Sequence, residues 1–235
     1  MRHKLLILIL LIIICDLQAQ NNKTTFGLQY KPIVPSQYFN SSHLEKESGL
    51  YSFKLDPQYS YSLGMVLRHK INKTFSAEYG MNYIQRNYKL LIDNKLIIND
   101  FTSFGIRSYE IPVQLLTYVQ ASKLWYVNVA FGLSHNILTS DILSYGFADD
   151  NFIQNTYRKN SSYVALLANI GMEYRTADKG CYYFGTSLHR PWKELARIYP
   201  EYKNNFNDDI DFEEKFFLEL IGTFITLDIR YFFGY

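Results

Sequence analysis

Long segments in which apolar and polar side chains alternate at every second residue restrict the fold of this chain more than any other feature of its sequence. Odd-numbered residues 125–133 are Trp, Val, Val, Phe and Leu, whereas even-numbered residues 128–136 are Asn, Ala, Gly, Ser and Asn. Successive side chains of a β-strand point to opposite faces, so this period predicts strands with one apolar and one polar face. A soluble sheet can show the same alternation. These segments, however, reach about ten residues or more, the length that crosses a bilayer at a tilt.

Eight such segments are separated by connectors that alternate between short and long. The expected strands cover residues 25–31, 59–69, 75–88, 104–118, 124–138, 161–175, 181–189 and 217–233. Short polar connectors cover residues 70–74, 119–123 and 176–180, and long ones cover 32–58, 89–103, 139–160 and 190–216. Short turns at one end and long loops at the other are typical of outer-membrane barrels. The sequence therefore predicts an all-β fold, an eight-stranded antiparallel up-and-down transmembrane β-barrel.

The first 19 residues have the features of a secretory signal peptide. Arg2 and Lys4 precede an apolar run over residues 5–14, and Ala19 ends a small-residue cleavage site. Cys15 could instead carry a lipid, but isoleucines precede it where a lipidation site has a small residue. We expect cleavage after residue 19 and one outer-membrane β-barrel domain over residues 20–235, located in the outer membrane of a Gram-negative bacterium.

The mature chain is close to neutral. Loss of two basic residues and one acidic residue with the signal leaves 24 − 2 = 22 basic and 22 − 1 = 21 acidic side chains. Nucleic-acid binding needs a basic face, so this balance gives no support to a nucleic-acid partner. Cys181 is the only cysteine left after cleavage, which excludes an intrachain disulfide and a thiolate metal cluster.

Aromatic residues make up 17% of the chain and gather where the strands meet their connectors. Amphipathic rings prefer the membrane–water interface, where they form the girdles of membrane barrels. At the loop end we expect an interface formed by Tyr59, Tyr61, Tyr83, Tyr88, Tyr109 and Tyr163. At the turn end we expect a second interface, which includes Trp125, Tyr174, Tyr231 and Phe233.

The carboxyl-terminal strand is the most specific local signal. Apolar or aromatic residues occupy every second position from Ile225 to Tyr235. This pattern resembles the terminal strand that the outer-membrane assembly machinery recognises, so that machinery and outer-membrane lipid are the expected partners. In a soluble sandwich the same row would lie uncovered on an edge strand.

Residues 108–116, SYEIPVQLL, lead through a short turn into residues 125–132, WYVNVAFG. This pair of segments resembles the middle of the PorT-like family of outer-membrane β-barrels, with Glu110, Ile111 and Pro112 at the matching positions. The resemblance extends over nearly the whole mature chain and implies the same barrel architecture. It carries no specific role, because the residues do not support transferring the secretion function of the family's namesake.

The alternation directs a balanced set of charges to the inside of the predicted barrel. Four cations face four anions in a bore that eight strands leave only wide enough for side chains, and buried charges need partners. We expect a lumen charge network of ion pairs rather than a diffusion pore, although a proton or ion relay is an alternative. The network comprises Arg68, Glu78, Arg86, Glu110, Glu173, Arg175, Asp228 and Arg230.

The sequence favours a non-enzymatic barrel whose extracellular loops bind a partner protein, a surface ligand or an envelope component. Pro112 interrupts a strand, either as a simple register adjustment or as a lateral opening for transport of a small hydrophobic molecule. A lipid-modifying enzyme is the third alternative, with His43 as its candidate residue, but no nucleophile elbow is present. Residues 207–214 are acidic without the spacing of a calcium loop, so a solvated loop is expected. We expect no catalytic, cofactor-binding or metal-binding residues.

Overall fold

The structure is a computed structural model that describes residues 24–35, 44–48, 51–94, 99–148, 152–176, 179–202 and 216–233. Within these ranges the chain consists of strands joined by turns and short irregular segments, and none of the described residues forms a helix that could span a membrane. The strands of the described segments are β1 (Thr24–Val34), β2 (Leu44–Ser48), β3 (Tyr51–Pro57), β4 (Ser60–Lys70), β5 (Phe75–Asn94), β6 (Asn99–Gln120), β7 (Trp125–Leu138), β8 (Ile142–Tyr145), β9 (Phe152–Arg158), β10 (Ser162–Arg175), β11 (Cys181–Pro191), β12 (Ala196–Tyr202), β13 (Leu218–Leu220) and β14 (Phe224–Phe232).

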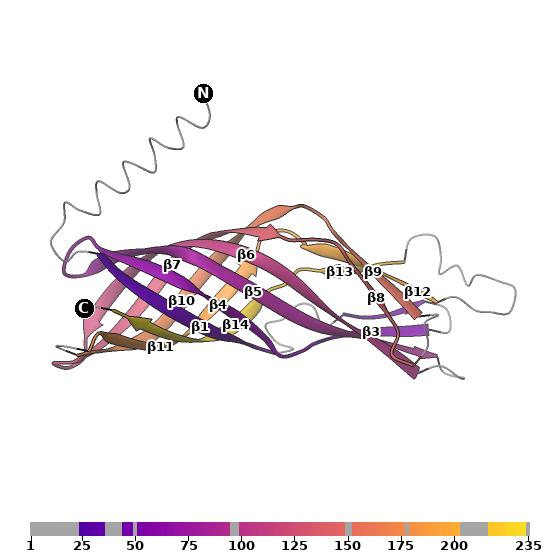
Figure 1. Ribbon diagram of the computed structural model, residues 1–235, viewed down its shortest axis with the longest axis horizontal. Coiled ribbons are helices and arrows are strands. Elements are labelled where there is room, and N and C mark those ends of the chain that lie inside the picture. The colour runs from indigo at the N-terminus through magenta and orange to yellow at the C-terminus, as the bar shows by residue number, and fades with distance from the viewer. Residues whose placement is uncertain are drawn as a thin grey trace, which may run out of the picture.

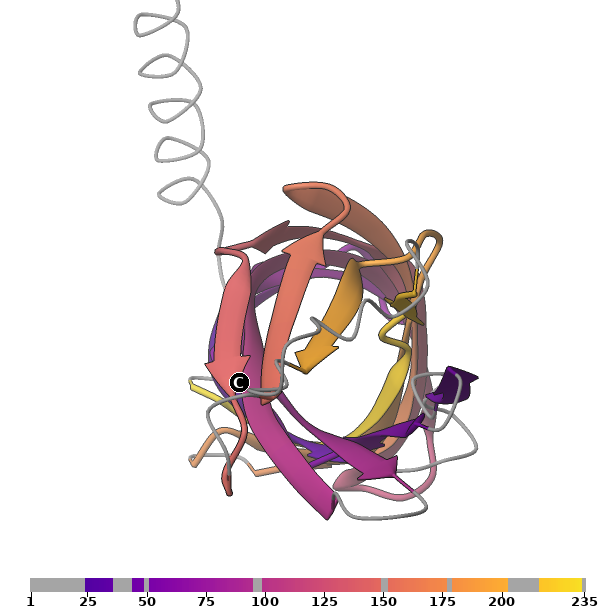
Figure 2. The ribbon, with the colours of Figure 1, turned by 90° about the vertical axis from the view of Figure 1, so that its right-hand side faces the viewer.

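Eight of these strands close into a ring, in the order β1-β4-β5-β6-β7-β10-β11-β14 and back to β1. Every pairing is antiparallel, and neighbours in the ring follow one another along the chain (Figures 1 and 2). Each of the eight sequence-predicted segments overlaps one ring strand. Closure leaves the ring without a free edge, so its backbone N–H and C=O groups can be satisfied without water.

The long connections are more structured than the sequence indicated. Six further strands lie beyond the ring at the loop end, on the right of Figure 1. β3 pairs with the distal half of β5 and β2 pairs with β3, while β13, β12, β9 and β8 form a separate four-stranded sheet. We call this part of the molecule the loop-end domain. These strands were not among the eight predicted from the sequence, and they form where apolar residues of the connectors build a core of their own.

The interior changes from polar to apolar along single strands. On β5 the inward side chains include Glu78 and Asn82 within the ring, and then Tyr88, Leu90 and Ile92 beyond it, all of them buried. The apolar residues pack against the inner face of the four-stranded sheet. This loop-end core contains Tyr51, Phe53, Leu55, Tyr88, Leu90, Ile92, Phe104, Ile106, Leu138, Phe152, Tyr163, Ala165, Leu195, Ala196, Ile198, Leu218 and Leu220.

Two expectations about strands and facing were wrong. The predicted strand 217–233 is broken into β13 and β14, because Gly222 adopts a φ of 75° and the chain leaves one sheet for the other. Tyr88 and Tyr163, expected at the loop-end interface, point inward and belong to the loop-end core. The signal peptide, His43, the acidic run 207–214 and Tyr235 lie outside the described residues.

Candidate functional site

Arg68 forms the centre of a polar network inside the ring. Its Nε donates to Glu78 Oε1 at 2.8 Å, and its Nη1 lies 2.8 Å from Glu173 Oε1. β4, which carries Arg68, and β10, which carries Glu173, are four strands apart in either direction around the ring. The contact between Arg68 and Glu173 therefore crosses the full width of the bore.

Arg230 makes a second connection across the interior. Its Nη1 lies 2.7 Å from Glu78 Oε2 and its Nη2 lies 2.6 Å from Asp228 Oδ2. Lys31 Nζ approaches the same Asp228 oxygen at 3.3 Å, and Arg175 Nη2 lies 2.9 Å from Glu173 Oε2. The structure thus brings together six of the eight predicted network charges and adds Lys31 to them.

Amide and hydroxyl groups donate further hydrogen bonds to the carboxylates of this network. Asn128 Nδ2 donates to Glu173 Oε1 at 2.6 Å, and Ser187 Oγ donates to Asp228 Oδ2 at 2.6 Å. Asn169 Nδ2 also donates to Asp228 Oδ2 at 3.1 Å, and Asn169 Oδ1 accepts from Tyr183 OH at 2.6 Å. A charge away from water is costly unless it is both paired and hydrogen-bonded, which explains why small polar residues line the inward positions next to these acids.

The other two predicted charges, Arg86 and Glu110, do not form ion pairs with the network. Glu110 Oε2 accepts from Asn82 Nδ2 at 2.7 Å, and its Oε1 lies 3.5 Å from His189 Nε2. Arg86 makes long contacts to the Gly222 carbonyl at 3.3 Å and to Tyr163 OH at 3.4 Å. Both residues are buried where the polar interior meets the loop-end core. The expected four-against-four pairing is therefore wrong for these two residues.

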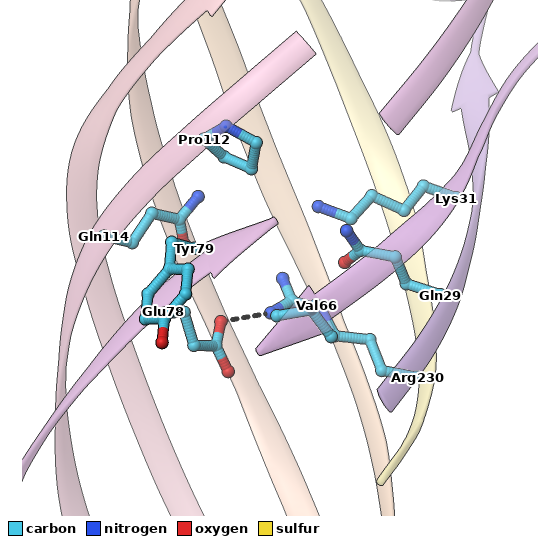
Figure 3. A pocket seen from close by; sticks show the side chains of 8 residues that line it. All are labelled: Gln29, Lys31, Val66, Glu78, Tyr79, Pro112, Gln114 and Arg230. Atoms are coloured by element: carbon cyan, nitrogen blue, oxygen red, sulfur yellow. Dashed lines mark hydrogen bonds and ion pairs between the residues drawn. The ribbon is translucent and has the colours of Figure 1, made fainter. Parts of the chain in front are cut away.

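The strand pairing of the ring has a gap at one place between β5 and β6. The ladder between these strands is interrupted where Gly80 and Met81 should face Pro112 and Ile111, because Pro112 has no N–H to donate. Gly80 is tightly fitted, since a Cβ there would overlap the Met65 carbonyl oxygen. A small space of about 10 Å³ reaches this place from the interior (Figure 3), and it is lined by Gln29, Lys31, Val66, Glu78, Tyr79, Pro112, Gln114 and Arg230.

The outside of the ring is apolar and carries aromatic rows near both ends. Toward the loop end, ring centroids are 6.4 Å apart for Tyr61 and Tyr83 and 5.8 Å for Tyr83 and Tyr109. Toward the turns, Trp125 and Tyr174 lie 5.0 Å apart, and Tyr231 and Phe233 lie 4.7 Å apart. Tyr59, one residue before β4, is 60% exposed and its hydroxyl lies 2.6 Å from that of Tyr30. Between the rows, exposed side chains include Leu28, Leu63, Met81, Val113, Phe131, Leu166, Ile170 and Leu227.

The outer face of the four-stranded sheet is also aromatic. Tyr157 and Tyr199 pack edge to face at 5.7 Å, and Tyr199 lies 5.7 Å from Phe217. Tyr145 and Tyr157 are more than half exposed. Charged residues surround the rings, including Lys159, whose hydrogen bond to Glu194 lowers the pKa of that carboxyl. The loop-end domain thus presents an aromatic surface with a charged border.

Comparison with known proteins identifies the fold. No family model matches the chain, and no curated protein is similar to it in sequence. Among solved structures it is similar to the outer membrane protein OprG from Pseudomonas aeruginosa, with a TM-score of 0.55 and 9% identity over 91% of this chain and 97% of OprG. The chain therefore has the antiparallel all-β fold of an outer-membrane barrel protein.

Two interior residues could have been found from the sequence but were not. Lys31 shares its parity with Gln29 in a strand where Leu28 and Tyr30 face outward. His189 shares its parity with Ser187 and Tyr183 on β11. Alternation alone would have directed both Lys31 and His189 inward. Among the residues that the structure describes, no group of three or more His, Cys, Asp or Glu side chains could hold a metal ion.

Proposed function

We propose that this protein is an eight-stranded transmembrane β-barrel of a Gram-negative outer membrane. We further propose that it is not an enzyme, and that it works by binding a partner protein, a surface ligand or an envelope component at its loop-end domain. The closed ring, the apolar outside with aromatic rows, and the fold shared with OprG support the membrane location. The ion pairs that cross the interior argue against a diffusion pore.

The observation that carries the binding function is the loop-end domain itself. Its two sheets enclose a buried apolar core, which gives it a defined shape outside the ring. A surface built on a packed core loses little entropy on binding, and exposed tyrosines are favoured in binding surfaces. Tyr145, Tyr157 and Tyr199 supply such a surface on the outer face of the four-stranded sheet.

Photo-crosslinking in intact cells tests this function. A photoreactive amino acid at Tyr157 should yield discrete adducts with an envelope or surface component. The same amino acid at Ser122, in the turn between β6 and β7, provides the control at the opposite end of the ring. The proposed function fails if both positions yield the same adducts or if Tyr157 yields none.

The remaining assignments are consistent with this proposal and are part of it. They are membership in the PorT-like family, cleavage of residues 1–19, insertion by the outer-membrane assembly machinery through the carboxyl-terminal strand, and contact with outer-membrane lipid. The row of Tyr231, Ile229 and Leu227 on β14 supports the insertion signal. A lipid-modifying activity is not proposed, because the sequence has no Gly-x-Ser-x-Gly nucleophile elbow.

Lateral transport of a small hydrophobic molecule is a second candidate, favoured by the interrupted ladder at Pro112. The space beside Pro112 is lined by Tyr79, which is 40% exposed on the outside, and by Glu78 and Arg230 on the inside. Pro112→Ala restores a donor and should slow amide exchange at Gly80 and Met81. If the gap is a route, this variant should also slow uptake of an apolar fluorescent probe into vesicles. Unchanged uptake would exclude the route.

A further inference from the structure

Two strand edges face each other in the loop-end domain without pairing. Among the described strands, β2 pairs with β3 alone and β13 pairs with β12 alone. The nearest Cα atoms of β2 and β13 lie within 8 Å of each other. Paired antiparallel strands have Cα atoms about 4.5–5.5 Å apart. An unpaired edge offers a row of backbone donors and acceptors to another strand.

Lys46 bridges these edges with its side chain. Its Nζ donates to the carbonyl oxygen of Phe217 at 3.1 Å and lies 5.0 Å from the ring centroid of Phe216. In a paired edge a backbone N–H would reach the Phe217 carbonyl instead. The Lys46 side chain thus donates to a carbonyl oxygen that a neighbouring strand would otherwise pair with. A backbone N–H of an added strand could replace the Lys46 ammonium there.

A cleft lies beside the two edges. Its volume is about 360 Å³, it is open to solvent, and it is lined by Glu45, Lys46, Phe217, Leu218 and Glu219. An extended residue occupies about 160 Å³, from a rise of about 3.3 Å, a strand spacing of about 4.8 Å and a sheet spacing of about 10 Å. The cleft therefore has room for about two residues of extended chain, and a longer segment requires the edges to move apart.

The side chains around the cleft differ between its two faces. On the inner face, Leu218 belongs to the buried loop-end core. On the outer face, Glu45 is exposed and Glu219 forms a 3.7 Å ion pair with Arg197. A strand in the cleft would alternate between these faces, so its inward residues would meet apolar groups and its outward residues would meet two carboxylates.

We propose that this cleft binds an extended peptide segment of alternating apolar and basic residues, which pairs with β2 and β13 as an added strand. Entry releases Lys46 from the Phe217 carbonyl and spreads the edges to about 10 Å, twice the spacing of paired strands. Strand addition to an open edge is a common mode of peptide recognition. The proposal rests on the binding function assigned to the loop-end domain and names the chemistry of one ligand.

Binding of a defined peptide to the purified mature protein in zwitterionic lipid nanodiscs tests this inference. The probe is a fluorescein-labelled heptapeptide of alternating lysine and valine, and empty nanodiscs provide the background. We expect saturable binding by fluorescence anisotropy, with slower amide exchange in residues 44–48 and 218–220 and unchanged exchange in β9. The same peptide methylated on alternate backbone nitrogens should lose binding, because it cannot pair with one of the two edges.

Substitutions test separately the two carboxylates beside the cleft and the contact of Lys46 with the Phe217 carbonyl. Glu45→Lys with Glu219→Lys should weaken binding of the lysine peptide about tenfold and strengthen a glutamate–valine peptide, as expected for two reversed cross-strand charge pairs. Glu201→Lys, on the outer face of β12 away from the cleft, is the matched control and should change neither peptide. Lys46→Met removes the bridge but keeps an apolar stem, and should tighten binding about threefold.

Three results would overturn the inference: no binding of the lysine peptide, equal binding of the methylated peptide, or protection of residues 44–48 and 218–220 before any peptide is added. The last result would mean that the protein's own chain already closes the cleft. Crosslinking from Tyr157 in cells can succeed in each of these cases, so failure of this inference is distinguishable from failure of the proposed function.

Discussion

Arg68 and Glu173 lie on opposite sides of the ring, and their side chains meet at 2.8 Å in its interior. Both are buried, and both have further partners on other strands, Glu78 for Arg68 and Asn128 for Glu173. Opening a passage through this level would separate charges that have no water to replace their partners. The contact ties distant strands together and fills the bore at the same level.

The filled bore predicts the electrical behaviour of the protein. Purified protein in planar bilayers should show no large steady conductance, because the contacts of Arg68 and Arg230 occupy the interior. The recording should stay closed over the whole range of applied voltages. A stable, wide channel would contradict the closed interior and would make a pore the leading function.

The two kinds of buried acid should differ in their effect on stability. Glu173→Gln removes the carboxylate that Arg68 and Arg175 both contact, and should lower the free energy of unfolding by about 3–5 kcal/mol. Glu110→Gln keeps an amide oxygen that can accept from Asn82 and removes no ion pair with an arginine, so it should cost only about 1 kcal/mol. Urea unfolding of the protein in lipid vesicles measures both. Equal costs would mean that the two acids share one network.

The apolar outside of the ring, which the proposed function places in lipid, predicts a position-dependent cost of charge. Ile170 is 53% exposed near the middle of β10, so Ile170→Arg should destabilise the folded protein in lipid by about 2–4 kcal/mol. Tyr157 has nearly the same exposure, 52%, but lies on the loop-end domain. Tyr157→Arg should change stability by less than about 0.5 kcal/mol. Similar effects of the two substitutions would place both residues in the same environment.

We expect the loop-end core to unfold without unfolding of the ring. Phe53 is fully buried and its ring centroid lies 5.0 Å from that of Phe216. Phe53→Ala should cost about 3–5 kcal/mol locally, and limited proteolysis should then cleave the loop-end domain while the ring stays intact. Tyr145→Ala, at an exposed position, should leave the cleavage pattern unchanged. Loss of the whole protein, ring included, would show that the two parts unfold together.

Alternation predicted the ring strands well because it is a local property of the chain. A side chain's face follows from its parity within a strand, so Glu78, Glu173 and Asp228 could be directed inward without knowledge of their partners. Partners depend on which strands face each other across the ring. Parity therefore placed Arg86 and Glu110 inside correctly, yet suggested ion pairs that the structure does not form.

The loop-end domain shows where local patterns fail. β2, β8 and β13 have only three to five residues each, too few to show a clear period. Their strand pairing depends on an apolar core assembled from residues far apart in the chain, such as Phe53, Phe152 and Leu218. The break at Gly222 has the same origin, since the left-handed φ sends the chain from one sheet to the other.

By itself, the sequence determined the class of fold and the face of most side chains, because the two-residue period of a strand is set by backbone geometry alone. Only the tertiary structure decided that Arg68 meets Glu173 rather than Glu110, that Lys31 joins the network, and that the connectors fold into a second packed body. These features depend on contacts between strands that are distant along the chain, and such contacts exist only once the ring has closed.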